Sequence, residues 1–111
     1  GDTGMLDADR IYHELESAGD DWADKKAGYE ALDRNTKSVL SDVLLTFMDG
    51  GLSRAESETR ALSSSTYKSH LASVSAAHKA YLQAQVLWNN LQMLAELRRS
   101  EESTRRQEMK L

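Results

Sequence analysis

The stretch IYHELESAGDDWADKKAGYEALDRNTKSVLSDVLLTF, residues 11–47, repeats mostly apolar residues at alternating steps of four and three. This heptad repeat is typical of a long helix that packs along one side against another helix. Its predicted packing positions are Ile11, Leu15, Ala18, Trp22, Lys25, Tyr29, Leu32, Thr36, Val39, Val43 and Thr46. A second heptad places Tyr67, Leu71, Val74, His78, Tyr81, Gln85, Trp88, Gln92 and Ala95 at packing positions. The chain is therefore expected to be built from two long helices.

The residues between the two heptad repeats set the expected boundaries of the helices. The chain has no proline, and Gly50-Gly51 ends the first heptad, since glycine takes the left-handed conformation that closes a helix. Ser53 followed by Glu56 has the spacing of a capping box. We expect helices over about residues 7–49, 53–62 and 65–107, with a bend near Gly19. The short helix is expected to direct Leu52, Ala55, Thr59 and Leu62 toward the tip of the hairpin.

These elements predict an all-α fold: an antiparallel hairpin of two long helices with a short connecting helix. The expected pairing lays Val43 beside Leu71, and it sets Thr36 beside His78 as a polar layer. It also brings Trp22 and Trp88 to within a turn of each other. One domain over residues 5–111 is expected, and residues 1–4, which precede Met5, are expected to derive from a cloning vector.

A hairpin of two helices has little interior, so a dimeric or higher helical bundle is expected. The second heptad supports this, because apolar residues lie on more than one side of its helix. The candidate face for self-association or for another protein comprises Leu82, Val86, Leu87, Trp88, Leu91 and Leu94. The first expected partner is therefore a second copy of the chain, and the next is a host or phage protein.

Charge is distributed unevenly along a chain whose net charge is −4. The candidate acidic face comprises Glu14, Glu16, Asp20, Asp21 and Asp24. The candidate basic face comprises the pairs Arg98-Arg99 and Arg105-Arg106, which stand seven residues apart and so share one side of a helix. These arginines can contact nucleic-acid phosphates or can form salt bridges within or between subunits. Salt bridges are the favoured interpretation, because glutamates interleave with the arginines and the whole chain is acidic.

The residue pattern points away from catalysis and cofactors. His13 stands four residues after Asp9 and three before Glu16, which gives three metal-ligand types on one side of a helix. A metal site of the di-iron type needs such groups from several helices, so no metal site is predicted. Cysteine is absent, and no nucleophile elbow or phosphate-binding glycine loop occurs. The expectation is a non-enzymatic protein without a cofactor. The sequence contains no run of 18 apolar residues, so no membrane span is predicted.

Three segments, residues 22–32, 53–62 and 98–106, resemble small uncharacterised all-helical proteins of tailed phages and prophages. The first reads WADKKAGYEAL, the second SRAESETRAL and the third RRSEESTRR. The resemblance implies no established activity and no site residues. It implies a phage accessory protein in the cytoplasm of a bacterial host, acting as a protein-binding adaptor or inhibitor. The alternatives are a nucleic-acid-associated factor in phage recombination and a structural or assembly component of the particle.

Overall fold

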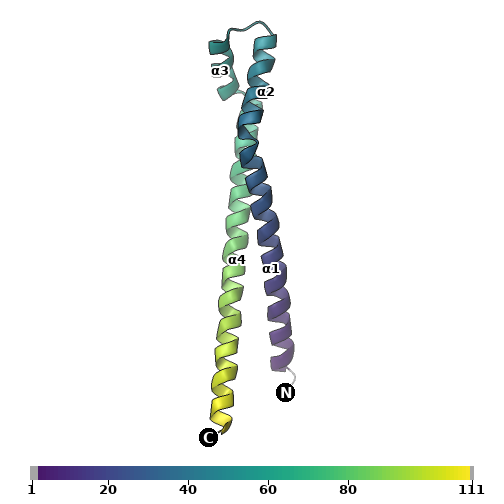
Figure 1. Cartoon of the computed structure of the whole chain (residues 1–111), viewed down its shortest axis with the longest axis vertical. Coiled ribbons are helices and arrows are strands. Elements are labelled where there is room, and N and C mark those ends of the chain that lie inside the picture. Colours follow the sequence, from purple (N-terminus) through teal and green to yellow (C-terminus); the bar gives the residue numbers. More distant parts are fainter. Residues whose placement is uncertain (1–2, 111) are drawn as a thin grey trace. The chain divides into compact units, whose positions relative to one another are not determined.

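The computed structural model describes the backbone of residues 3–110 and the side chains of residues 8–110, and the fold is all-α (Figure 1). Its helices are α1 (Thr3–Arg34), α2 (Thr36–Asp49), α3 (Arg54–Ser63) and α4 (Ser65–Lys110). Among the described residues there is no strand, so the predicted fold class is confirmed. Two compact units share these helices: a central unit, residues 25–81, and a terminal unit, residues 1–24 with 82–111.

The interruption in the first long helical stretch lies at Asn35 and not at Gly19, which sits inside α1. The Asn35 backbone N–H is shared between the carbonyls of Ala31 (3.3 Å) and Leu32 (3.2 Å), a three-centre bond that marks a tightened turn. The helix is thus continuous at Gly19, and the bend expected there stays a prediction. The vector-derived stretch predicted for residues 1–4 begins outside the described residues and stays a prediction.

Hydrogen bonds at both ends of the loop between α2 and α3 fix where these helices stop and start. The Gly51 N–H donates a hydrogen bond to Met48 O (3.0 Å), and the Leu52 N–H donates one to Phe47 O (3.3 Å). Together they form the pair of hydrogen bonds of a Schellman motif. Gly51 has φ +99°, a conformation that glycine adopts without strain. Ser53 Oγ then accepts from the Glu56 N–H at 3.2 Å, which confirms the N-cap half of the predicted capping box.

In the central unit, α3 packs against α2, and this changes the register of α4 against the first long stretch (Figure 1). Thr36 Oγ1 lies 2.9 Å from His70 Nε2, and the His78 ring stacks on Tyr29 at 4.5 Å between centroids. The predicted Thr36–His78 layer was therefore wrong by two helical turns. The expected register assumed that α4 reaches the end of α2, but α3 occupies that place.

The inner side of α3 is made of small residues. Ser57 and Ala61 are fully buried, whereas Ala55 and Thr59 are exposed and Leu62 is 54% exposed. The residues that α3 packs inward are therefore Ser57 and Ala61, and the side predicted to face the tip of the hairpin is largely exposed. Small side chains allow the α3 and α2 backbones to approach closely. A prediction that looks for large apolar residues such as leucine therefore misses this contact.

The packing positions predicted for the first heptad agree with the burial, apart from two. Lys25 and Thr46 are exposed, and their neighbours Lys26 and Phe47 are partly buried instead. The second heptad was predicted less well: Leu71, His78 and Gln92 are exposed. Their places on the packed side of α4 are taken by His70, Ala77, Ala84 and Leu91. Alanine at these positions gives the helix a packing face that hydrophobic size alone does not reveal.

Candidate functional site

The terminal unit is held together by a tryptophan pair. The rings of Trp22 on α1 and Trp88 on α4 lie 4.7 Å apart between centroids with an interplanar angle of 32°. This confirms the contact expected from the two heptads. The Trp88 indole lies over Gly19, where an added Cβ would stand 3.0 Å from Trp88 Nε1. Gly19 therefore provides the space that the Trp88 ring occupies.

A matched pair of glycine substitutions tests this role. Gly28 also lies inside α1, but a Cβ added there meets nothing within 4 Å. Gly28→Ala should raise the free energy of unfolding by about 1 kcal/mol, the helix-propensity difference between the two residues. Gly19→Ala gains the same propensity but pushes against the stacked Trp88 ring, so its free energy of unfolding should fall below that of Gly28→Ala. Equal stabilisation in urea titrations of the two variants would contradict this role of Gly19.

Beside the tryptophan pair, a groove runs between α1 and α4 of the terminal unit. Its volume is about 450 Å³, and its lining consists of His13, Glu14, Ser17, Ala18, Asp21, Leu87 and Leu91. Leu87 is 53% exposed, whereas Ala18 is buried at 7%. The groove thus has an apolar floor from both helices and polar side chains along α1. This is the surface that we call the terminal groove.

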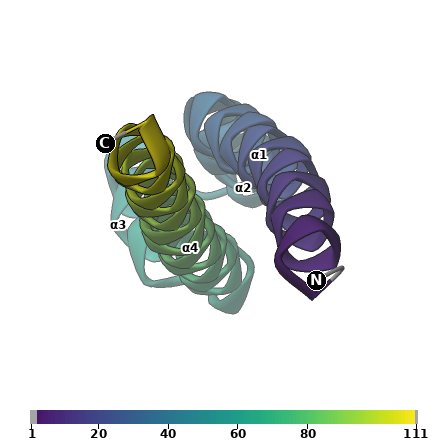
Figure 2. The same cartoon turned by 90° about the horizontal axis from the view of Figure 1, so that it is seen from below.

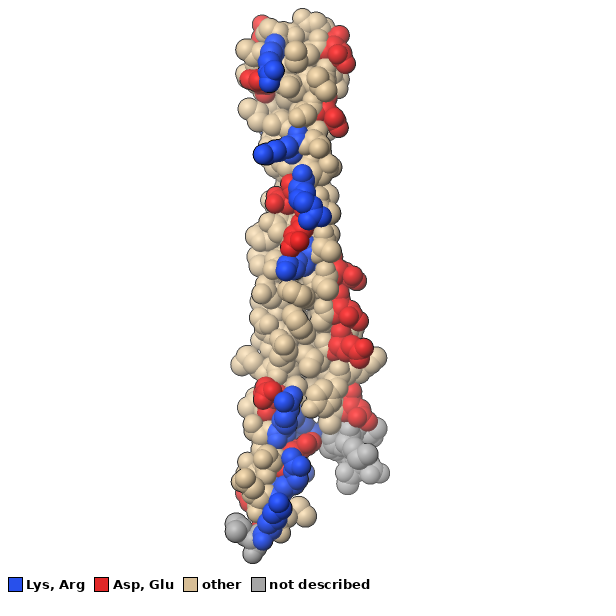
Figure 3. Space-filling model, viewed as in Figure 1, with Lys and Arg blue, Asp and Glu red and all other residues tan. Residues whose placement is uncertain are grey.

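Only part of the predicted acidic face lines the terminal groove. Glu14 and Asp21 line the terminal groove, seven residues or two helical turns apart. Glu16, Asp20 and Asp24 are exposed on α1 but are not among the lining residues. Figure 3 shows acidic side chains gathered along α1 in this unit. The groove therefore has one negatively charged rim.

The predicted apolar face of α4 also divides into parts. Trp88 contacts Trp22, and the partly buried Leu91 lines the terminal groove with Leu87. Leu82, Val86 and Leu94 are 44%, 59% and 42% exposed. Met93 and Leu97, left outside the predicted face, are more exposed still, at 64% and 60%. The sequence indicates that they share a side of α4 with Leu82 and Val86. Met93 follows Leu82 by eleven residues and Leu97 follows Val86 by eleven, which is close to three full turns.

The predicted basic face is only partly open for a ligand. Arg99 Nη1 forms a salt bridge with Glu96 Oε1 at 3.2 Å on the same helix. Arg98 is partly buried, and Arg105 and Arg106 are exposed. Arg99 is thus engaged in a salt bridge, and Arg98 is partly covered by the protein. The four guanidinium groups therefore do not form one open array for phosphates.

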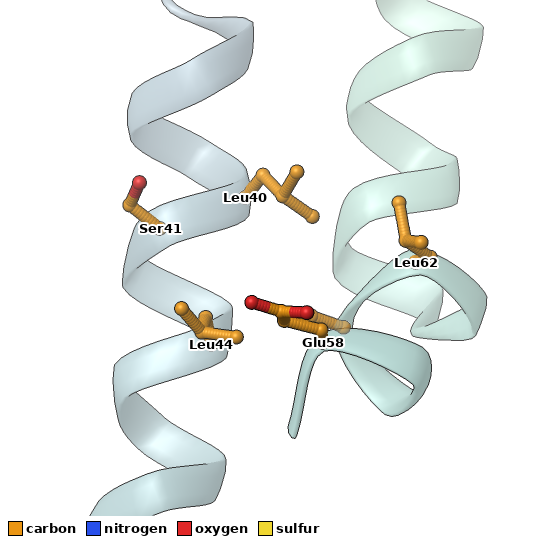
Figure 4. A pocket seen from close by; sticks show the side chains of 6 residues that line it. Leu40, Ser41, Leu44, Glu58 and Leu62 are labelled. Atoms are coloured by element: carbon orange, nitrogen blue, oxygen red, sulfur yellow. The ribbon is translucent and has the colours of Figure 1, made fainter. Parts of the chain in front are cut away.

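The central unit carries a separate recess of about 280 Å³ between α2 and α3. Figure 4 shows Leu40 of α2 and Leu62 of α3 pointing toward one another, with Glu58 reaching toward Leu44. Glu58 Oε1 accepts a bond from Arg54 Nε at 3.1 Å, so its carboxylate is already engaged. The rest of the lining consists of Ser41 and Ala61, so most of the recess is apolar.

Neither a metal-binding cluster nor a membrane-spanning helix is found in the described part of the chain. No group of three or more histidine, aspartate or glutamate side chains within residues 8–110 is placed to hold a metal ion. Within the helices that the structure describes, no segment combines the length and apolarity that crossing a membrane requires. No protein-family model, curated protein or solved structure matches the chain. The likeness to phage proteins therefore stays a prediction from the three sequence segments.

Proposed function

We propose that the protein is a non-enzymatic adaptor whose terminal groove binds an amphipathic helix with basic residues along one edge. The observation that carries this proposal is the combination of the leucine-lined floor with the carboxylates of Glu14 and Asp21. Amphipathic helices bind such grooves through apolar residues at positions i, i+3 or i+4, and i+7. The ligand would lie along α1 and α4 as a third helix.

The apolar part of the groove supplies the affinity in this proposal. Leu87 is half exposed in the free protein, so a docked helix would remove apolar surface from water. Each square ångström so removed contributes about 25 cal/mol. Leu94, 42% exposed and seven residues beyond Leu87, extends the same side of α4 by two turns.

The charged rim supplies the selectivity. Glu14 and Asp21 stand about 10 Å apart along α1, since seven residues rise 1.5 Å each. Lysine or arginine residues spaced seven apart on a docked helix would reach both carboxylates, of which Asp21 also takes part in an interaction within the chain. An acidic helix of the same apolar pattern would be repelled, because like charges across an interface are unfavourable.

For the whole chain we infer an antiparallel hairpin in which α3 forms part of the connection. The order of contacts within the central unit supports it: Tyr29 pairs with His78, and the later residue Thr36 pairs with the earlier residue His70. In the terminal unit, Trp22 pairs with Trp88 in the same sense. The terminal groove is lined by two long helices, which suits a preformed binding site.

The test uses synthetic helical peptides with one leucine stripe and either lysine or glutamate at positions seven apart. We expect the lysine peptide to bind the full-length protein in isothermal titration calorimetry and the glutamate peptide to bind much more weakly. Equal affinity of the two peptides, or no binding of either, would contradict the proposal. The charge-reversed double variant Glu14→Lys, Asp21→Lys should exchange the order of the two peptides.

A pair of leucine substitutions separates the groove from the rest of α4. Leu87→Glu places a charge on the groove floor and should remove binding of the lysine peptide. Leu82→Glu places the same charge outside the groove lining and should leave that binding unchanged. Circular dichroism of both variants shows whether helicity is retained.

A further inference from the structure

In the terminal unit, α1 lies along one side of α4 (Figure 2). A second set of apolar side chains lies on α4 away from that side. It consists of Leu82, Val86, Met93 and Leu97, with exposures of 44%, 59%, 64% and 60%. At 100° per residue these four side chains fall within an arc of about 60°. Trp88, which contacts α1, points to the opposite side of the helix. We call these four residues the outer stripe.

The outer stripe has a spacing that reads the same in both directions. The steps from Leu82 to Val86, from Val86 to Met93 and from Met93 to Leu97 are four, seven and four residues. The midpoint falls between Asn89 and Asn90. An antiparallel two-fold pairing of copies fits such a pattern, because each residue i that contacts j of the partner is matched by j contacting i.

We propose that the outer stripe binds the outer stripe of a second copy, with the two α4 helices antiparallel about an axis between Asn89 and Asn90. Leu82 then meets Leu97 of the other copy, and Val86 meets Met93. Each apolar residue has an apolar counterpart, so the pairing removes all four side chains of each copy from water. A partner of unrelated sequence would have no reason to match this symmetry.

The charges on this part of α4 agree with pairing between copies. The fourteen residues from Leu82 to Ala95 contain no charged side chain, in a chain with 29% charged residues. Figure 3 shows the corresponding part of the surface free of blue and red. An antiparallel arrangement also sets Glu96 beside Gln83 of the other copy. A parallel one would set Glu96 beside itself, and like charges across an interface are unfavourable.

The two central asparagines suit the two-fold axis. An asparagine amide carries both donors and an acceptor, so Asn89 of one copy can bond to Asn90 of the other. Polar residues within an apolar helix interface fix the register at some cost in affinity. Asn89 and Asn90 would thus hold the stripes at the one alignment in which the leucines oppose each other.

The size of the stripe predicts a reversible dimer. Sixteen residues of helix span about 24 Å, and with a helix diameter of about 10 Å one face covers less than the roughly 800 Å² per partner of a standard interface. The dimer should therefore form and dissociate with concentration. It leaves the terminal groove open, because Leu87 and Leu91 lie on another side of α4, so a dimer would present two grooves.

Crosslinking between single cysteines tests the geometry, since the natural chain contains none. A mixture of Leu82→Cys and Leu97→Cys proteins should form crosslinked dimers with a short thiol-reactive reagent. Leu82→Cys alone should not, because its two copies would stand about 22 Å apart along the helices. Crosslinking of Leu82→Cys with itself, without the mixed product, would overturn the antiparallel arrangement.

Sedimentation velocity over a range of concentrations tests whether the dimer exists. The wild-type protein should shift from monomer to dimer as its concentration rises. Val86→Lys and Met93→Glu should each stay monomeric, whereas their equimolar mixture should recover the dimer, because the introduced lysine of one copy would meet the introduced glutamate of the other. A wild-type protein that stays monomeric at every concentration would overturn the proposal, and the peptide titrations would still report on the groove.

Discussion

Replacing Trp88 with alanine is expected to lower the free energy of unfolding by about 3 kcal/mol, at the low end for large aromatic truncations because the ring is partly exposed. The substitution removes the stacked contact with Trp22 and the ring that covers Gly19. Gly19 itself has no side chain that could refill the space left by the ring. The melting temperature should fall by roughly 12 °C, given about 4 °C per kcal/mol for a domain of this size.

Urea titration followed by circular dichroism measures this loss, and Tyr12→Ala provides the control. Tyr12 is also aromatic and also lies in the terminal unit, but 49% of its surface is exposed. Its truncation should change the free energy of unfolding by no more than about 0.5 kcal/mol. If both variants lost the same stability, the tryptophan pair would not be the centre of this unit.

The tryptophan contact is an example of what the sequence predicts well. Trp22 and Trp88 are large, and each is the single tryptophan at a packing position of its heptad repeat, so the periodicity places both rings on the packing sides of their helices. The packing positions of the first heptad follow for the same reason. The Gly50-Gly51 stop and the Ser53 cap could also be predicted, because they depend on backbone chemistry within a few residues.

The register could not be predicted in the same way, because it depends on where α3 lies. Sequence periodicity fixes which side of a helix packs but not how far one helix slides along another. The Thr36–His70 hydrogen bond exists because α3 occupies the space beside the end of α2. Placing α3 would have required recognising Ser57 and Ala61 as its inner side, and neither residue is distinguished by hydrophobicity.

The candidate site was also predicted from the sequence only in part. The sequence identified the surplus of apolar residues on α4 and the acids on α1. It did not show that Glu14 and Asp21 share a groove with Leu87, while Glu16 and Asp20 lie elsewhere. That distinction depends on the rotation of α1 relative to α4, which is set by the small residues between them.

Ala84 is one of these small residues, and Ala84→Leu is expected to lower the free energy of unfolding by about 2–3 kcal/mol. Ala84 is 7% exposed and lies one helical turn before Trp88, on the side of α4 that contacts α1. A leucine there has no room unless the two helices move apart. That movement would also weaken the stacking of Trp22 on Trp88, so the fluorescence of the folded variant should shift toward that of exposed tryptophan.

The matched control is Ala23→Leu, the same substitution at an exposed position of α1 in the terminal unit. Alanine and leucine have similar helix propensities, so the control should change the free energy of unfolding by no more than about 0.5 kcal/mol. Urea titrations of the two variants give the comparison. If Ala84→Leu were as stable as Ala23→Leu, the spacing of α1 and α4 would not be set by alanine. The orientation of Leu87 and Leu91 toward the terminal groove would then need another cause.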